Sequence, residues 1–199
     1  MGKAAHTLPM PLPLPMPTPE LVRSMAAAFD ADRFTLARHR AVRLACETWP
    51  GNDDLARVLA KVVLVNRVFS TNLFHIDAMA GHIVSLAIDP ALARGDVDVV
   101  ELVARAPDLG RVKRAYSFAT KYCAAHRPEV YQIYDANVEA ALWAYQRRSP
   151  FGEFERSELW EYPSFIAVVD AFRGFFGLRD SSRVELDRFL WMVGQGQVA

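Results

Sequence analysis

A run of basic residues followed by one carboxylate is the part of this sequence best suited to chemistry on a polyanion. Between Gly110 and Pro128 the chain carries five bases, one histidine and no acid, although the whole chain has 23 basic and 23 acidic residues. Positive charge gathered on one face of a neutral protein favours binding to nucleic acid. Shortly after these bases comes Asp135, at the expected start of a helix. We call the five bases the basic strip: Arg111, Lys113, Arg114, Lys121 and Arg127.

Asp135 has two interpretations. An aspartate at a helix N-terminus is a common N-cap, which contributes about 1 kcal/mol to stability. A carboxylate beside a sugar that is losing its base would instead stabilise the positive charge that develops there and orient an attacking water. The two roles are compatible, and the residues upstream favour a catalytic role for Asp135.

Those upstream residues begin with the turn A-P-D-L-G, which ends at Gly110. A glycine-ended turn directly before a helix aims backbone N–H groups at a phosphate, so we expect Gly110 and the basic strip to hold a DNA backbone. Lys113 is also the first candidate for attack on the sugar, a role that requires a deprotonated amine. Lys121 is the second candidate, although a solvated charge is the simpler interpretation for it.

A base must leave the duplex stack before an enzyme can reach its sugar, and it then needs an apolar, aromatic pocket. Tyr116 lies within the basic strip and Tyr134 follows it, and both could form part of such a pocket. Phe69, Ser70 and Asn72 lie at the end of an earlier expected helix. We expect all five to surround the extruded nucleotide. The alternative for the stretch from Ser70 to Asn72 is a helix stop followed by an N-cap.

Three segments together resemble the helix-hairpin-helix DNA glycosylase superfamily. They are A-P-D-L-G at 106–110, K-R-A at 113–115 and I-Y-D-A-N-V at 133–138. They are similar to the family's hairpin L-P-G-(V/I)-G, its Lys-x-Ala, and the aspartate that begins a later helix. This chain has Asp108 in place of the first hairpin glycine, and it lacks the family's iron–sulfur cysteines.

The resemblance implies a DNA glycosylase that hydrolyses the N-glycosidic bond of an altered or unusual base in double-stranded DNA. Asp135 would be its catalytic carboxylate, and Lys113 would add AP lyase activity. It implies no cofactor and no metal in the chemistry. Two alternatives remain open: a non-catalytic helical module that binds DNA or RNA, and an interaction protein whose basic strip meets an acidic partner.

The elements that must position these residues are helices. Apolar residues recur at helical spacing along the chain, and no segment shows the alternation of a strand. We expect an all-α fold of about eight helices in one domain, residues 20–199, with a glycosylase-like core. The first helical stretch should break at Asp30–Ala31, and Asn52 or Asp53 should cap the helix after the loop at 49–54. Residues 1–19, with proline at nearly every second position, should form a disordered or extended tail.

Composition limits the other function classes. Cys46 and Cys123 are too few for a disulfide framework and fit buried free thiols in a reducing cytoplasm, where the protein would be associated with the nucleoid. The histidines, including His75, His82 and His126, show no metal-ligand spacing. No apolar run approaches the roughly 20 residues needed to cross a bilayer, so no membrane is expected among the partners. We expect a monomer.

Overall fold

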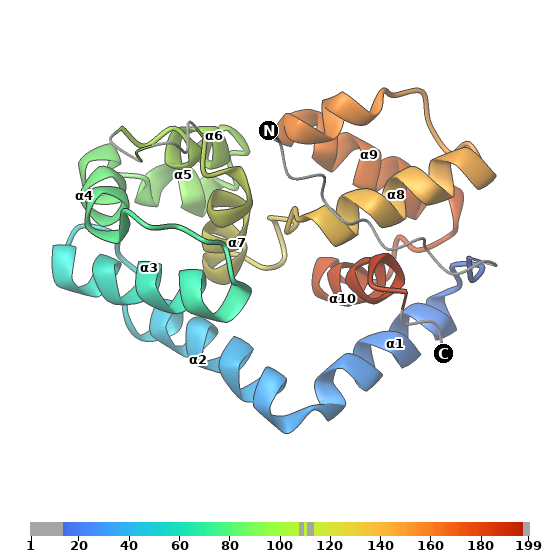
Figure 1. Cartoon of the computed structure of the whole chain (residues 1–199), viewed down its shortest axis with the longest axis horizontal. Coiled ribbons are helices and arrows are strands. Elements are labelled where there is room, and N and C mark those ends of the chain that lie inside the picture. Colours follow the sequence, from blue (N-terminus) through green and yellow to red (C-terminus); the bar gives the residue numbers. More distant parts are fainter. Residues whose placement is uncertain (1–13, 108–109, 111–113, 197–199) are drawn as a thin grey trace.

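The structure, a computed structural model, describes residues 14–107, 110 and 114–196, and within these ranges it is helical and contains no strand (Figure 1). The predicted all-α class is therefore confirmed. The described part has ten α-helices, two more than expected, and one short 3₁₀ helix. They are α1 (Pro19–Ala31), α2 (Arg33–Thr48), α3 (Leu55–Phe69), α4 (Ile76–Leu86), α5 (Asp89–Arg94), α6 (Asp98–Ala104), α7 (Tyr116–His126), α8 (Ala136–Arg148), η1 (Arg156–Trp160), α9 (Tyr162–Phe175) and α10 (Arg183–Gly194).

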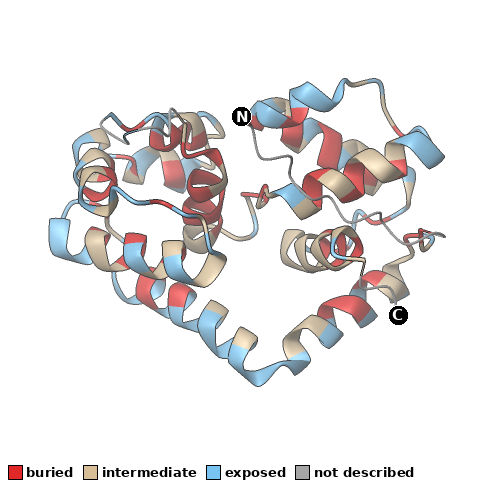
Figure 2. Cartoon of the chain, viewed as in Figure 1, coloured by how far each residue is buried: buried red, intermediate tan, exposed pale blue. Residues whose placement is uncertain are grey.

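The helices form two groups that lie side by side (Figure 1). The first lobe consists of α2 to α7, in which α3 packs against α2, α4 and α7, and α6 packs against α7. The second lobe consists of α1, α8, η1, α9 and α10, in which α10 packs against both α1 and α8. The chain passes between the lobes twice, at Asp32 and through residues 127–135. The buried apolar side chains nevertheless form one continuous cluster that draws on both lobes (Figure 2).

The first passage lies where the sequence predicts a break. Asp32 has extended backbone angles and caps α2, because its carboxylate accepts hydrogen bonds from Phe34 N and Thr35 N, both at 3.2 Å. An aspartate whose side chain competes for backbone N–H groups favours such a helix start over a helix interior. The elbow between α1 and α2 therefore follows directly from the local sequence.

Two local predictions need correction, and one short helix was not predicted. The N-cap of α3 is Asp54, whose Oδ1 accepts from Arg57 N at 2.9 Å, and not Asn52 or Asp53. Ser70 does end α3, with a left-handed backbone at φ 50°, but α4 begins only after His75 and receives no cap from the stretch at 70–72. The acidic stretch after Leu86 contains a helix of its own, α5, which begins at an Asp-Pro pair.

The predicted tail extends too far toward the C-terminus. Residues 1–13 of it lie outside the described residues, but residues 14–18 pack on α8. Leu14 is buried, its carbonyl accepts from Arg148, and the carbonyl of Pro15 accepts from Tyr145 Oη at 2.9 Å. Thr18 then caps α1. These contacts depend on side chains more than a hundred residues away, so proline spacing alone could not predict them.

A buried lysine holds the loop between α2 and α3. Lys61 Nζ lies 3.1 Å from Trp49 O, 2.8 Å from Gly51 O and 2.7 Å from Asn52 Oδ1, and the side chain is fully buried. Tyr122 Oη donates to the same Asn52 oxygen at 2.6 Å. We call this set the Lys61 network. It ties α3 and α7 to the loop, and its polar groups satisfy one another without solvent.

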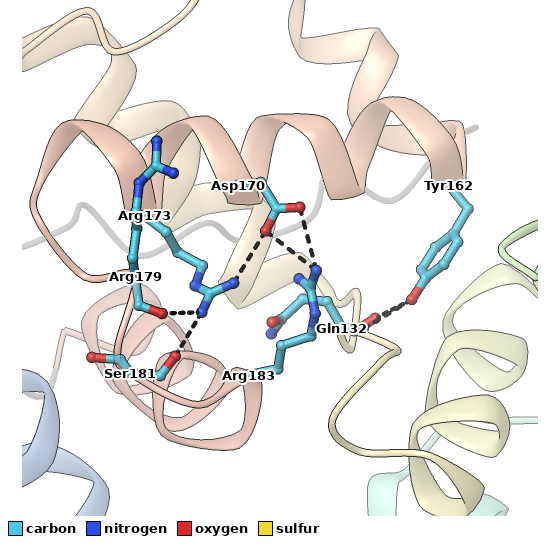
Figure 3. Close-up of polar contacts among 7 residues, drawn as sticks. All are labelled: Gln132, Tyr162, Asp170, Arg173, Arg179, Ser181 and Arg183. Carbon is cyan, nitrogen blue, oxygen red and sulfur yellow. Dashed lines mark hydrogen bonds and ion pairs between the residues drawn. The ribbon is translucent and has the colours of Figure 1, made fainter. Parts of the chain in front are cut away.

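Polar contacts also fix α10 against α9 (Figure 3). Arg183, at the start of α10, pairs with Asp170 of α9 at 3.2 Å, and Arg173 donates to the carbonyls of Arg179 and Ser181 at 2.7 and 2.9 Å. Nearby, Tyr162 Oη donates to Gln132 O at 3.1 Å and accepts from Gln132 N at 2.9 Å, which anchors the second passage between the lobes. These contacts fix the positions of α10 and of residues 130–135, and both segments contribute to the site described below.

Among the residues that the structure describes, no helix has both the length and the apolar character to cross a membrane. Cys46 and Cys123 are free and buried, as predicted. Burial raises the pKa of the Cys46 thiol to about 11, so this group is an unreactive core side chain.

Candidate active site

A cavity of about 970 Å³ lies between the two lobes. Its walls come from the elbow of α1 and α2, the end of α3, the start of α7, residues 133–137, the end of η1, and α10. It contains eight of the twelve residues that the sequence predicts for the site: Phe69, Ser70, Asn72, Arg114, Tyr116, Lys121, Tyr134 and Asp135. These eight residues lie between positions 69 and 135 of the sequence, so only the packing of the lobes brings them together.

Asp135 is the N-cap of α8, as predicted. One carboxylate oxygen, Oδ1, accepts hydrogen bonds from Asn137 N and Val138 N, both at 3.0 Å. The other oxygen, Oδ2, points to Lys121 Nζ at 3.7 Å, and the side chain is 18 % exposed toward the cavity. The cap fixes the rotamer of the carboxylate through Oδ1 and leaves Oδ2 for another partner. The capping hydrogen bonds and the ion pair are thus divided between the two oxygens of one side chain.

Lys121 lies deep in this cavity and not on an exposed face, which corrects the interpretation of it as a solvated charge and as a DNA-backbone contact. Its side chain is 5 % exposed, and Nζ donates to Ser117 Oγ at 2.7 Å, one helical turn earlier on α7. Ser117 Oγ in turn donates to Tyr134 O at 3.2 Å. Burial lowers the pKa of the Lys121 ammonium, while the nearby carboxylates of Asp135 and Asp187 raise it in part.

Asp187 of α10 also lines the cavity, and it was not predicted from the sequence. Its Oδ1 is buried and has no hydrogen-bond partner among the described residues. The pKa of Asp187 is raised to about 8, mainly by burial and also by the charge of Asp135, while Lys121 and Arg188 act in the opposite direction. One aspartate within an apolar helix pattern gives no signal in the sequence, because its neighbours across the cavity come from α7 and α8.

Aromatic rings line the cavity on two sides. Tyr116 and Tyr134 lie with ring centroids 4.7 Å apart, and Trp160 lies 6.0 Å from Tyr134. Across the cavity, Phe29 contacts Trp191 edge to face at 5.6 Å. Tyr116 and Tyr134 are among the predicted base-pocket residues, whereas the rings from α1, η1 and α10 were not predicted for the site. Rings on two sides can hold a flat heterocycle by stacking.

The corner after α3 forms another part of the wall. Ser70 and Asn72 both have left-handed backbone angles, φ 50° and 56°, which are uncommon for residues other than glycine. Asn66 holds this corner: its Oδ1 accepts from Leu73 N at 3.0 Å and from Thr71 Oγ1 at 2.7 Å. The corner is therefore rigid enough to present Ser70 and Asn72 to the cavity, and it is not an N-cap.

The three described bases of the basic strip do not form one positive face. Arg111 and Lys113 lie outside the described residues. Arg114 lines the cavity but pairs with Glu101, through Nε and Oε2 at 3.0 Å, and stacks on the ring of Tyr116 at 4.3 Å. Arg127 pairs with Glu129 and donates to Ala93 O at 2.8 Å and Leu92 O at 3.2 Å, near the end of α5. Of the three described bases, one is buried and two are paired with acids that lie close in space.

Two glycines have positions in which a larger residue would be strained. Gly110, at φ 63°, would place a Cβ 2.7 Å from His75 Nε2, which fits its prediction as a turn residue. Gly194, in α10, would place a Cβ 2.2 Å from Asn137 O. Because Asn137 follows Asp135 by two residues, this close approach sets the depth at which α10 packs on the start of α8.

No group of three or more His, Cys, Asp or Glu side chains in the described ranges could hold a metal ion. The cavity is lined by four carboxyl groups (Asp32, Asp135, Glu139 and Asp187), one amine (Lys121) and aromatic rings. His39 also lines it, and burial lowers the pKa of this imidazole to about 4, with Arg188 and Arg38 acting in the same direction, so it is neutral at physiological pH.

Comparison with known proteins places the chain in a family. It belongs to the HI_0787_N family, described as an N-terminal domain, which matches residues 21–130 and thus more than half of the chain. An uncharacterized protein of Haemophilus influenzae is 36 % identical over 139 residues, which are 69 % of this chain and 66 % of that protein. The match thus spans slightly less than two thirds of the relative's length. No solved structure matches the chain significantly. The family match includes Lys121 and ends before Asp135.

Proposed function

We propose that this protein is a DNA glycosylase that accepts an extruded, altered nucleotide in the cavity between its lobes. The observation that carries this proposal is the pairing of Lys121 and Asp135 at 3.7 Å inside a cavity lined with aromatic rings. A volume of about 970 Å³ is large enough for a nucleoside, since ligand pockets commonly measure about 300–1,000 Å³.

Base removal places positive charge on the sugar as the glycosidic bond breaks. Asp135 Oδ2 faces the cavity, and its orientation is fixed by the two backbone hydrogen bonds to Oδ1. A preorganised carboxylate stabilises such charge without the cost of reorientation during the reaction. This is the role that the resemblance to helix-hairpin-helix glycosylases implies for Asp135.

The amine for the second part of the reaction is Lys121 in this proposal. The sequence favours Lys113, which lies outside the described residues, with Lys121 as the second candidate. A nucleophilic lysine must be desolvated and partly deprotonated, and burial lowers the pKa of Lys121 in this direction. Attack of the Lys121 amine on the sugar C1′ would form an imine, which gives AP lyase activity in addition to base release.

The walls suit a flat heterocycle. Tyr116, Tyr134 and Trp160 offer rings on one side, while Asn72 and Ser70 supply polar groups from a rigid corner. Selectivity for one base over another would come from such polar groups, because a site built to hydrogen-bond a particular edge rejects analogues that lack it. The proposed substrate is therefore an altered base that is already weakly paired and costs little to extrude.

The test uses the full chain and double-stranded oligonucleotides that each contain one altered base. Wild type should release a base from at least one of them, and Asp135→Asn should lower the rate by about 100-fold or more. The matched control is Asp54→Asn, since Asp54 also caps a helix but lies outside the cavity. Equal loss in both variants would show that only the cap matters.

The lysine is assigned by reductive trapping on DNA that contains an abasic site. Borohydride should cross-link wild type and Lys113→Gln to the DNA but not Lys121→Met. The reverse pattern would make Lys113 the nucleophile. If wild type binds the DNA but releases no base and forms no cross-link, the protein is a nucleic-acid-binding module. If it does not bind DNA even at low salt, where phosphate contacts are strongest, an interaction protein is indicated.

A further inference from the structure

We infer that Asp187 is the proton-transfer residue of the cavity: it gives a proton to the departing base and then takes one from Lys121. This inference rests on the proposed function and extends it to a residue on α10 that lies outside the family match.

Asp187 faces the same cavity as Lys121 and Asp135, so one side chain from each of α7, α8's N-cap and α10 meets there. It also borders a smaller cavity of about 100 Å³, between α2, the end of α7 and α10. Its buried Oδ1 has no hydrogen-bond partner among the described residues. Most buried polar atoms have partners, so this oxygen remains available to a group that enters the cavity.

Several helices that pack near Asp187 contribute charged or titratable side chains to its surroundings. Lys121 comes from α7 and Asp135 from the cap of α8, and both act on its charge. Arg188 is adjacent in α10 and pairs with Asp30 of α1 at 2.6 Å. Arg183 precedes it by one turn and is engaged with Asp170. His39 of α2 borders both cavities and is neutral near pH 7, and Arg43 of α2 borders the smaller cavity and pairs with Glu47 at 2.9 Å.

These surroundings favour a neutral carboxylic acid at physiological pH. With Lys121 as an ammonium and Asp135 as a carboxylate, the buried site has no net charge when Asp187 carries a proton. Ionisation of Asp187 would leave an uncompensated negative charge in a poorly solvated place, which is why its pKa rises to about 8. A carboxylic acid kept neutral near pH 7 is in the correct state to donate a proton.

The reaction then balances in three steps. The glycosidic bond breaks, and the base leaves with the electron pair and takes the proton of Asp187, while Asp135 faces the sugar cation. The Asp187 carboxylate next accepts a proton from the Lys121 ammonium through one bridging water, because the polar contacts of Lys121 Nζ are to Ser117 and Asp135, and Lys121 becomes a free amine. The lone pair of this amine forms the bond to C1′, and the nitrogen keeps the positive charge. The net change is one ammonium and one nucleoside converted into a protonated Lys121–sugar adduct and a neutral base, with Asp187 again protonated.

The first test measures the proton link without any DNA. Potassium cyanate carbamylates only neutral amines, so the pH dependence of Lys121 labelling, followed by mass spectrometry of peptides, reports the titration of Lys121. An ionised Asp187 favours the ammonium, so in Asp187→Asn the midpoint should fall by about one pH unit. Asp180→Asn, which changes an exposed acid in the turn before α10, is the matched control and should leave the midpoint unchanged. Superimposable titrations of wild type and Asp187→Asn would overturn the inference.

The second test separates the two steps on DNA. Asp187→Asn should release base about 100-fold more slowly, because it cannot donate the proton. It should still form the borohydride-trapped imine on DNA that already contains an abasic site, and the pH dependence of trapping should shift downward. Unchanged base release would refute the role of Asp187. If wild type itself releases no base, the proposed function fails, whereas the cyanate titration still decides whether Lys121 and Asp187 share a proton. Should Asp187→Asn fail to fold, Asp187→Ser serves in both tests.

Discussion

The two buried lysines that the structure describes, Lys61 and Lys121, differ in what surrounds the amine. Lys61 has three fixed oxygen acceptors within 3.1 Å, from Trp49, Gly51 and Asn52, and its network is closed. Lys121 has one hydroxyl partner, Ser117, and one carboxylate at 3.7 Å, and it faces a cavity. Burial lowers the pKa of both amines. Burial alone therefore does not identify a reactive lysine. We expect reactivity where a buried amine has few hydrogen-bond acceptors and faces a cavity.

The largest expected effect is on stability, and it tests whether Lys61 has a structural role that Lys121 lacks. Lys61→Met should lower the free energy of unfolding by about 3 kcal/mol, because it leaves the carbonyls of Trp49 and Gly51 buried without a donor. Lys121→Met should cost about 1 kcal/mol or less, since the desolvation of its ammonium is removed with it. Urea unfolding followed by circular dichroism measures both. Similar decreases in the free energy of unfolding of the two variants would contradict the proposed difference between Lys61 and Lys121.

A second variant acts on the cavity through packing. Gly194→Ala should destabilise the protein by about 2 kcal/mol, because its Cβ would lie 2.2 Å from Asn137 O and must push α10 away from the start of α8. Base release should fall as well, since Asp135 moves with α8. Gly81→Ala, where a Cβ would meet nothing within 4 Å, is the matched control and should be close to neutral in both assays.

Chemical labelling compares the two amines directly. In the native protein near neutral pH, cyanate should modify Lys121 at least about tenfold faster than Lys61, because access to Lys61 requires local opening of its network. Peptide mass spectrometry at short reaction times gives the two rates. Faster labelling of Lys61 would contradict the view that its network is closed.

The smallest effect is a pH dependence of stability. The pKa of Asp187 is raised from 3.8 to about 8, so between these values the folded state binds one more proton than the unfolded state. The free energy of unfolding therefore falls as pH rises through this window, and Asp187→Asn should remove this part of the fall. From pH 5 to pH 8 the variant should gain about 1 kcal/mol or more relative to wild type. A constant difference between the two proteins across this range would contradict the assignment.

Much of the site could be predicted because its signals are local. A lone aspartate before an apolar helical pattern predicts an N-cap, and Asp135 is one. A polar triplet after an apolar helix predicts a break, and α3 ends at Phe69. The aromatic residues Tyr116 and Tyr134 lie next to that aspartate or to the glycine turn, and both line the cavity.

Other features could not be predicted because they depend on partners far away in the chain. Arg127 is basic in the sequence, but its guanidinium is engaged by carbonyls at the end of α5. Arg114 is neutralised in part by Glu101, which precedes it by thirteen residues. A count of charges along a segment cannot show which of them will meet an acid in the fold, so the strip appears more positive in sequence than in space.

The sequence alone determined the all-α class, the break at the first elbow, the helix that Asp135 begins and the residue types from which a base-excision site could be made. These depend on helical periodicity and on capping side chains, which act within a few residues. Only the tertiary structure shows that Lys121 faces Asp135 and that Asp187 of α10 lines the same cavity. It also shows that Lys61, although buried, lies outside this cavity. These features depend on how the two lobes pack, because desolvation and charge interactions are set by distances in space and not by separation along the chain.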